Sequence, residues 1–170
     1  MFEKMINKKR QLIKKKIIKK LSKFIKKGDV INCEFDLAKF NSILNISKNK
    51  SHFINFFIEV FLDLIGPKGT LIVPTFTYSW GKDKEKKLFD IKNSIPKVGI
   101  LPSHLISLPS VSRTLDPMFS FAIMGNNKKY FTNISNNSFG KKSVYEKILL
   151  QKGKLISVSY THLRAHETRH

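Results

Sequence analysis

The sequence is poor in cysteine, arginine and acidic residues. Its single cysteine, Cys33, excludes a disulfide framework within the 170 residues and fits a reducing compartment. Only 4 of the 32 basic residues are arginines, and 12 acidic residues leave a net charge of +20. Arginine is the side chain that binds phosphates and bases in a bidentate manner. The excess of lysine therefore argues against nucleic acid as the working partner, although the charge alone would suggest one.

Long apolar runs and nucleotide-binding motifs are also missing. No uninterrupted apolar segment follows the basic N-terminus, so we expect no signal peptide. The most apolar stretch, residues 53–65, contains Asn55, Glu59 and Asp63 and is too short and too charged to span a bilayer. Neither G-x-x-x-x-G-K-[ST] nor G-x-G-x-x-G occurs, which argues against P-loop and dinucleotide-binding folds. We expect a cytoplasmic protein without a membrane span.

The first 27 residues predict a basic amphipathic helix. They contain twelve basic residues and one acid, and so carry eleven of the twenty net positive charges. Such a helix can lie on anionic lipid, but we favour a helix whose apolar stripe docks on a protein core while its lysines face solvent. We expect it to belong to one domain with residues 28–158. The apolar stripe consists of Ile13, Ile17, Leu21, Phe24 and Ile25.

Strand and helix patterns alternate along the rest of the chain and predict an α/β fold. A β-branched segment at 30–33, an apolar helix at 52–65 and a second apolar strand at 70–73 form a βαβ unit. Such a crossover joins parallel strands and places its helix on a face of the sheet, so we expect a three-layer α/β/α fold with a largely parallel sheet. Further predicted elements are a helix at 101–108, a strand at 118–124, a helix from a Ser143 cap to Leu150, and a strand at 155–158.

Three polar segments adjoin the predicted strand ends, where open parallel sheets bind their ligands. They span residues 34–39, 74–80 and 112–120, and they supply carboxylates, hydroxyls and one arginine that could clamp an anion. We expect them to form a crevice for a small molecule. The candidate binding residues are Glu34, Asp36, Thr75, Thr77, Arg113, Thr114, Asp116 and Ser120.

Several of these residues also have purely structural interpretations. Arg113 could pair with Asp116 across a turn, Asp36 could cap loop backbone, and Thr75 could satisfy backbone groups. Structural roles are also favoured for three residues outside the crevice. His52 lies at a helix start, His104 lies on a short helix, and Cys33 lies at a buried strand end.

The last twelve residues, 159–170, differ in composition from the rest of the chain. They contain no lysine but hold three of the five histidines and two of the four arginines. We interpret them as a foreign-looking tail fused to a truncated gene and exclude them from the candidate site. His162, His166 and Glu167 have the spacing H-x3-H-E, which is not the zinc-binding H-E-x-x-H, and we expect no metal.

Four segments together give the chain a family resemblance: GDVINCEFDLAKF, GPKGTLIVPTFT, SRTLDPMFSFAIMG and GKKSVYEKIL. From about residue 10 to 158 the sequence resembles the aminoglycoside 3-N-acetyltransferase (antibiotic N-acetyltransferase) family. The resemblance implies an α/β fold, acetyl-CoA as co-substrate and direct acetyl transfer, without metal, to an amine of an aminoglycoside or an amino sugar. It implies a role in antibiotic resistance or polysaccharide modification.

The sequence departs from the family pattern at several positions. The family commonly has His-Ser-Ser where this chain has residues 34–36, a glycine where it has Asn41, and a histidine where it has Asp116. The resemblance also implies a T-x-x-H-x-x-E motif after the strand at 155–158, and the tail does not reproduce that spacing. We therefore expect this chain to lack its general base, to be inactive, and to have a sheet incomplete at its C-terminal edge.

Two questions about the function stay open at this stage. Asp36 and Asp116 remain as candidates for a catalytic role. The alternative function is a non-catalytic, lysine-rich protein that binds nucleic acid or a membrane surface. The identity of the amine and the oligomeric state are not specified by the sequence.

Overall fold

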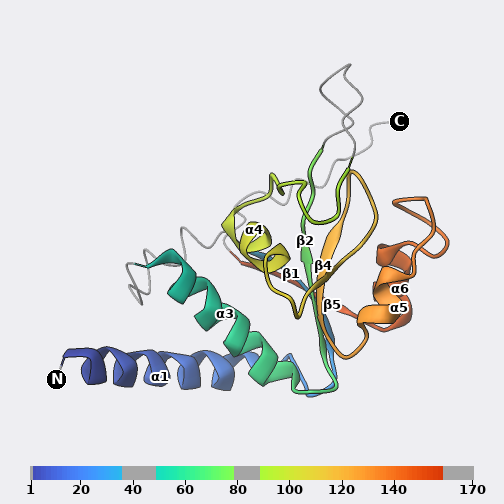
Figure 1. Cartoon of the computed structure of the whole chain (residues 1–170). Helices are drawn as coiled ribbons and strands as arrows, with labels where there is room; N and C mark the ends of the chain where they lie inside the picture. The colour runs from blue at the N-terminus through green and yellow to red at the C-terminus, as the bar shows by residue number, and fades with distance from the viewer. Residues whose placement is uncertain (1, 36–48, 79–88, 159–170) are drawn as a thin grey trace, which may run out of the picture.

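The computed structural model describes residues 2–35, 49–78 and 89–158. Within these ranges a central sheet is covered by helices on both faces (Figure 1). The expected three-layer α/β fold is confirmed. The elements are α1 (Phe2–Leu21), β1 (Val30–Phe35), α3 (Lys50–Ile65), β2 (Thr70–Pro74), α4 (Ile100–Ile106), β3 (Ser112–Arg113), β4 (Phe121–Gly125), α5 (Lys128–Thr132), α6 (Val144–Leu150) and β5 (Lys154–Val158).

The sheet has the strand order β3-β4-β2-β1-β5. Strand β1 pairs in parallel with β2 and with β5, in agreement with the predicted βαβ unit. Strand β4 runs antiparallel to β2 with Pro74 opposite Phe121, and β3 is antiparallel to β4. Because β4 is antiparallel, the segment before it lies at the same edge of the sheet as the segment that follows β2.

Alternate residues of the strands face two separate cores. Ile31, Cys33, Leu71 and Val73 pack with α1, α3 and α4 on one face of the sheet. Val30, Ile72 and Ile123 pack with α5 and α6 on the other face. Successive side chains of a strand point to opposite faces, so apolar residues at every position require helices on both sides.

Helix α3 supplies the largest apolar surface. Nine of its sixteen residues are buried, which accounts for the apolar pattern around most of its circumference. It begins two residues earlier than predicted because the Asn49 side chain caps it, accepting a hydrogen bond from the backbone N–H of His52 at 3.2 Å. At the other end, Gly66 adopts a φ of +65° and its N–H bonds to the carbonyl of Leu62.

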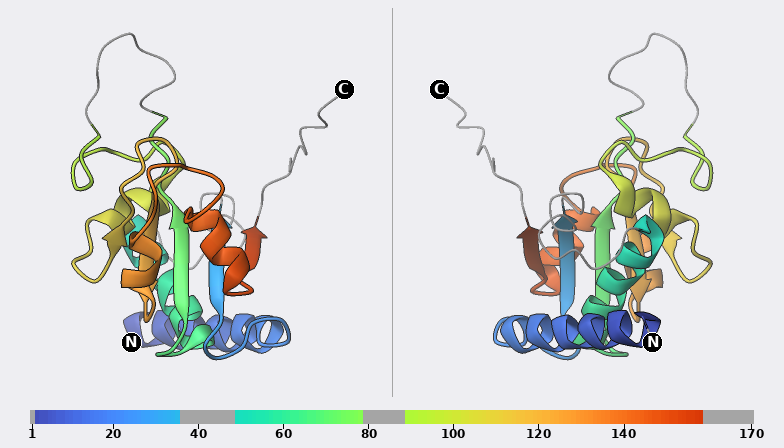
Figure 2. Two further views of the ribbon diagram at one scale, coloured as in Figure 1. Left: turned by 90° about the vertical axis from the view of Figure 1, so that its right-hand side faces the viewer. Right: turned by 90° about the vertical axis from the view of Figure 1, so that its left-hand side faces the viewer.

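Helix α1 docks on α3, as favoured from the sequence. Ile13, Ile17 and Leu21 pack against the core, and Ile25 is buried beyond the helix end. The inclusion of Phe24 in the apolar stripe was wrong, because its side chain is 72% exposed. The helix ends at Leu21, so the 3.6-residue periodicity does not carry through residue 24. Figure 2 shows α1 across the end of the sheet where the parallel strands begin.

Several strand boundaries differ from the predictions. Glu34 and Phe35 continue β1, where a loop was expected. Strand β4 begins at Phe121 instead of residue 118, because Asp116 accepts hydrogen bonds from the N–H groups of Met118 and Phe119 and holds them in a turn. The short elements β3 and α5 were not predicted. At the sheet edge, the Leu155 side chain of β5 is 59% exposed.

Candidate functional site at the carboxyl ends of β1 and β2

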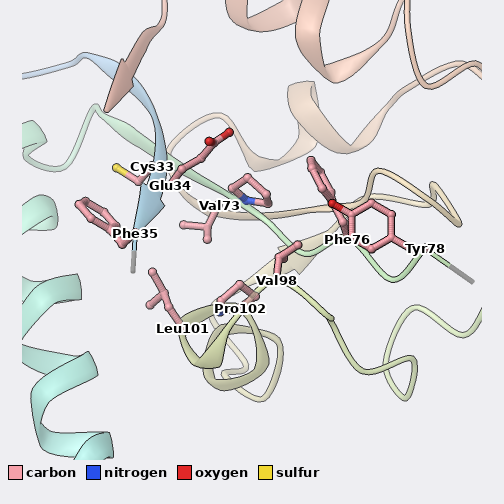
Figure 3. Close-up of a pocket in the computed structure, with 10 residues that line it drawn as sticks. Cys33, Glu34, Phe35, Val73, Phe76, Tyr78, Val98, Leu101 and Pro102 are labelled. Atoms are coloured by element: carbon pink, nitrogen blue, oxygen red, sulfur yellow. The ribbon is translucent and has the colours of Figure 1, made fainter. Parts of the chain in front are cut away.

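A pocket opens where β1 and β2 end (Figure 3). Its volume is about 180 Å³, smaller than the roughly 300–1,000 Å³ of pockets that enclose a drug-sized ligand. It can therefore hold one end of a larger molecule or a single small group. The lining residues come from β1, β2, the segment that follows β2, and α4 together with Val98 just before it. They are Cys33, Glu34, Phe35, Val73, Pro74, Phe76, Tyr78, Val98, Leu101 and Pro102.

Glu34 carries the one carboxylate among the described residues that line the pocket. Its side chain is half-buried, and the loss of water around it raises its pKa above the ordinary value of 4.5. The neighbouring Cys33 is fully buried, and burial raises the pKa of its thiol well above the ordinary value, with the charge of Glu34 as a second cause. A thiol held neutral is a poor nucleophile, so Cys33 contributes packing, as the sequence suggested.

Tyr145 of α6 lies close enough to Glu34 to sense its charge. Burial, followed by the charges of Glu34, Tyr78 and Asp116, raises the pKa of Tyr145 to about 12. The Tyr145 ring stacks on Phe139 at 5.2 Å and meets Phe121 edge-on at 5.3 Å. The phenol is therefore neutral at physiological pH, with its hydroxyl able to donate or accept a hydrogen bond.

Arg113 joins three backbone segments at this edge of the sheet. Its Nε donates to Thr75 Oγ1 and to Ser120 Oγ, both at 3.2 Å, and its Nη2 donates to the Thr75 carbonyl at 2.9 Å. Its Nη1 donates to the carbonyl of Ser94 at 2.6 Å and to that of Ile91 at 3.3 Å. The guanidinium also lies over the Phe89 ring at 4.9 Å. Arg113 thus fastens residues 89–94 to the end of β2.

The hydroxyl candidates near β2 are bonded within the same network. Thr75 Oγ1 and Ser120 Oγ lie 2.9 Å apart, and the N–H of Thr75 donates to the Ser120 carbonyl at 2.8 Å. Thr77 Oγ1 donates to the carbonyl of Pro117. Thr114 Oγ1 accepts from the N–H of Phe121 at 2.9 Å. All four side chains are buried, so they hold the backbone at the pocket edge.

The predicted crevice residues are brought together in part. Residues Thr75, Thr77, Arg113, Thr114, Asp116 and Ser120 gather at the expected edge of the sheet, whereas Asp36 lies outside the described residues. The possible Arg113–Asp116 pair does not form. Both residues lie within the described ranges. Asp116 Oδ1 accepts hydrogen bonds from the N–H groups of Met118 and Phe119. Arg113 instead donates to Thr75, Ser120 and backbone carbonyls. The turn at Asp116 therefore takes the carboxylate oxygen that an ion pair with Arg113 would need.

The two histidines within the described ranges lie away from the pocket lining. His104 of α4 bonds through Nε2 to Asn55 Oδ1 of α3 at 2.8 Å, and His52 lies in the first turn of α3. Both occupy the structural positions expected from the sequence. Within the described ranges, no group of three or more His, Cys, Asp or Glu side chains could hold a metal ion. None of the described helices is long and apolar enough to cross a membrane.

Sequence reasoning missed part of the pocket lining. Val98, Leu101 and Pro102 reach the pocket only because the segment after β2 folds back, with the N–H of Lys97 bonded to the Phe76 carbonyl at 2.8 Å. Tyr145 was not singled out either, since no local signal links a tyrosine on α6 to a carboxylate on β1. The aromatic residues Phe76 and Tyr78 of the P-T-F-T-Y segment were the signal in the sequence for an apolar pocket wall.

The fold is that of an α/β protein with a pocket beyond the carboxyl ends of its central strands, where proteins of this class bind ligands. The model of the aminoglycoside 3-N-acetyltransferase family matches residues 38–165, and the chain belongs to this family. The match includes β2, α4, β4 and α6, and it extends into the compositionally distinct tail. No curated protein sequence matches the chain.

Solved structures resemble the fold at low sequence identity. AAC-IIIb in its binary complex with CoASH has a TM-score of 0.68 at 19% identity, covering 85% of this chain and 58% of its own. Sisomicin-bound AAC-VIa has a TM-score of 0.66 at 17% identity, with coverages of 85% and 58%. The YokD protein from Bacillus subtilis has a TM-score of 0.63 at 18% identity, with coverages of 81% and 60%. This chain therefore spans a little over half the length of these structures.

Proposed function

We propose that the protein transfers an acetyl group from acetyl-CoA to an amine of an aminoglycoside or an amino sugar. The observation that carries this proposal is the family match over residues 38–165, which includes seven of the ten residues that line the pocket. Structures with the same fold contain CoASH in one case and sisomicin in another, so both ligand classes fit this architecture. We assign the activity to the cytoplasm, in keeping with a buried, unpaired Cys33.

The chemistry requires no metal. The neutral amine nitrogen attacks the thioester carbonyl carbon and forms the C–N bond, the C–S bond breaks, and CoA leaves as a thiol. A base takes one proton from the attacking nitrogen and this proton is passed on to the departing sulfur, so the products are an amide and CoASH and the base is regenerated. A positioned base and donors to the developing oxyanion accelerate such a step.

We infer that Glu34 is the pocket residue that contacts the amine. Its half-buried carboxylate attracts the protonated amine, and its raised pKa brings it nearer to the range in which it can accept a proton. Asp116 adds negative charge near Tyr145, although its Oδ1 is used within the turn. These carboxylates offset, at the site, the positive charge that would repel a polycationic substrate.

The remaining candidate residues receive supporting roles in this proposal. Arg113, Thr75 and Ser120 hold the loop that places Phe76 and Tyr78 at the pocket, and Thr77 and Thr114 hold the turn before β4. Arg113 donates its hydrogen bonds to carbonyl and hydroxyl groups of the protein itself, which argues against a role in binding phosphate. Asp36 stays a candidate for contact with the ligand, as the residue that follows β1.

The proposal is tested by ligand binding and by thiol release. The 170-residue chain is titrated with CoA in a calorimeter, then incubated with acetyl-CoA and sisomicin, apramycin or glucosamine while free thiol is measured. We expect CoA binding, and acetylation of an amine only at the low rate that is left without a positioned base. Because the tail lacks the T-x-x-H-x-x-E spacing, we expect turnover about 10²–10⁴-fold below that of an enzyme with a positioned base.

A matched pair of variants distinguishes the pocket from the rest of the surface. Glu34→Gln removes the carboxylate at the pocket, and Glu59→Gln removes one on α3 that faces Arg10 and Lys14. We expect only the first to weaken amine binding. An absence of both CoA binding and acetyl transfer in the folded wild-type chain would overturn the proposal.

A further inference from the structure

Helix α1 presents two chemically different faces. Its inner face contacts α3, where Arg10 lies 3.4 Å from Glu59 and Lys14 lies 2.7 Å from Asp63. The residues at positions 8, 12, 15, 16 and 19 share the opposite side, because spacings of three and four residues return to the same face of a helix. We call this side the outer face; it consists of Lys8, Leu12, Lys15, Lys16 and Lys19, all exposed.

The positive charge of the outer face is not neutralised within the described part of the protein. None of its four lysines forms an ion pair with a described carboxylate, in contrast to Arg10 and Lys14 on the inner face. Lys15 and Lys19 are like charges four residues apart, and Lys9 and Lys20 add exposed charge along the margins. Such pairs destabilise a helix. An anionic surface that lies along the helix would remove this repulsion.

Two apolar side chains stand out in this basic region. Leu12 is 56% exposed in the middle of the outer face, and Phe24 is 72% exposed just beyond the helix. The backbone of Phe24 is fixed, since its N–H donates to the Leu21 carbonyl at 2.9 Å and its own carbonyl accepts from Lys154 Nζ at 2.8 Å. The ring therefore projects from an ordered turn. Exposed apolar groups among lysines suit a membrane interface.

The outer face lies at the opposite end of the molecule from the pocket. Helix α1 crosses the end where β1 and β2 begin, and the pocket lies where these strands finish (Figures 1 and 2). A surface that binds α1 would consequently leave the pocket accessible.

We propose that the outer face of α1, together with Phe24, binds the surface of an anionic phospholipid bilayer. The helix lies parallel to the membrane while its apolar stripe stays on α3, so the attachment is electrostatic with shallow insertion of Leu12 and Phe24. Clusters of four to eight basic residues are sufficient for this kind of attraction. A bilayer fits better than nucleic acid, because the face offers lysines without arginine and places apolar groups among them.

The experiment is co-sedimentation of the full 170-residue chain with vesicles. Neutral phosphatidylcholine vesicles are compared with vesicles containing roughly one third phosphatidylserine. We expect binding to the anionic vesicles at about 0.1 M salt and its loss at about 0.5 M salt, where screening shortens the range of the charges. Equal binding to both vesicle types, or none to the anionic ones, would overturn the proposal.

Matched triple variants locate the surface. Lys15→Gln, Lys16→Gln and Lys19→Gln together should lower the vesicle partition coefficient about tenfold or more. Lys92→Gln, Lys97→Gln and Lys141→Gln remove the same charge from exposed sites away from α1 and should change it by less than about twofold. Circular dichroism checks that both variants are folded. Equal losses in the two variants would mean that net charge alone acts, and would contradict a specific face.

A second measurement separates the lipid from nucleic acid and does not depend on the lysine variants. Phe24→Ser should weaken vesicle binding severalfold without changing retention of a single-stranded oligonucleotide in a gel-shift assay. Tighter binding to the oligonucleotide than to anionic vesicles at the same salt would assign the face to nucleic acid and overturn the lipid proposal. These outcomes are independent of acetyl transfer.

Discussion

Arg113 and Thr75 are joined by two hydrogen bonds, one from Nε to the Thr75 hydroxyl at 3.2 Å and one from Nη2 to the Thr75 carbonyl at 2.9 Å. The two residues lie 38 positions apart in the chain. Their contact ties the strand pair β3–β4 to the end of β2, and the Ser94 carbonyl on the same guanidinium brings in the segment that leads to Val98. The wall of the pocket depends on this arrangement.

Replacing Arg113 should destabilise the protein far more than replacing a surface arginine. Arg113→Ala removes the donors to the Ser94 and Ile91 carbonyls and one of the two donors to the buried Thr75 carbonyl, and we expect a loss of about 3 kcal/mol in the free energy of unfolding. Arg10→Ala breaks a partly exposed pair with Glu59 and should cost no more than about 1 kcal/mol. Urea denaturation measures both. Similar losses for the two variants would contradict the role assigned to Arg113.

Glu34→Gln should stabilise the folded protein at neutral pH. The folded-state pKa of Glu34 lies above its ordinary value of 4.5, so folding favours the protonated form. The wild-type protein keeps this contribution below about pH 4 and loses it as the pH rises through the raised pKa. Glutamine stays neutral, so the variant's advantage should be near zero in acid and grow toward pH 7. Thermal melts at several pH values test this, and an advantage that is greatest in acid would contradict it.

Tyr145 should ionise well above the ordinary pKa of a tyrosine. Its pKa of about 12 lies above the ordinary 10.0, with burial as the main cause and the Glu34 charge next. In a stopped-flow jump to alkaline pH, Tyr145→Phe should remove the tyrosinate signal that appears near pH 12, and Glu34→Gln should shift that signal to lower pH. An unchanged titration curve in Tyr145→Phe would show that the assignment is wrong.

Gly125 should tolerate alanine much less well than Gly140. Both glycines have positive φ angles, +112° and +79°, but a Cβ on Gly125 would lie 2.3 Å from the Gly69 carbonyl oxygen, whereas one on Gly140 meets nothing within 4 Å. We expect Gly125→Ala to cost about 2–4 kcal/mol and Gly140→Ala about 1 kcal/mol. Chemical denaturation compares the variants. Equal costs would mean that backbone conformation, and not the close approach of β4 to residue 69, dominates.

Local patterns were sufficient to predict most elements of the fold. The N-cap at Ser143 is an example, because its side chain accepts from the N–H of Glu146 at 3.1 Å, although the Glu146 carboxylate accepts from the N–H of Lys142 and not from that of Ser143 as in a full capping box. The direction of β4 was not predictable, since an apolar segment has the same pattern in a parallel and in an antiparallel strand. The beginning of β4 was misjudged because the turn at Asp116 competes with strand pairing.

The sequence by itself determined the alternation of strands and helices, the docked basic helix and the polar segments at the strand ends, because these features follow from the spacing of apolar residues and from turn-forming residues. Only the tertiary structure decided which polar residues face a ligand pocket. Thr75, Arg113 and Ser120 are satisfied by one another, whereas Glu34, half-buried and close to Tyr145, is among the residues that line the pocket. That choice depends on hydrogen-bond partners far apart in the chain, which residue type and local spacing do not encode.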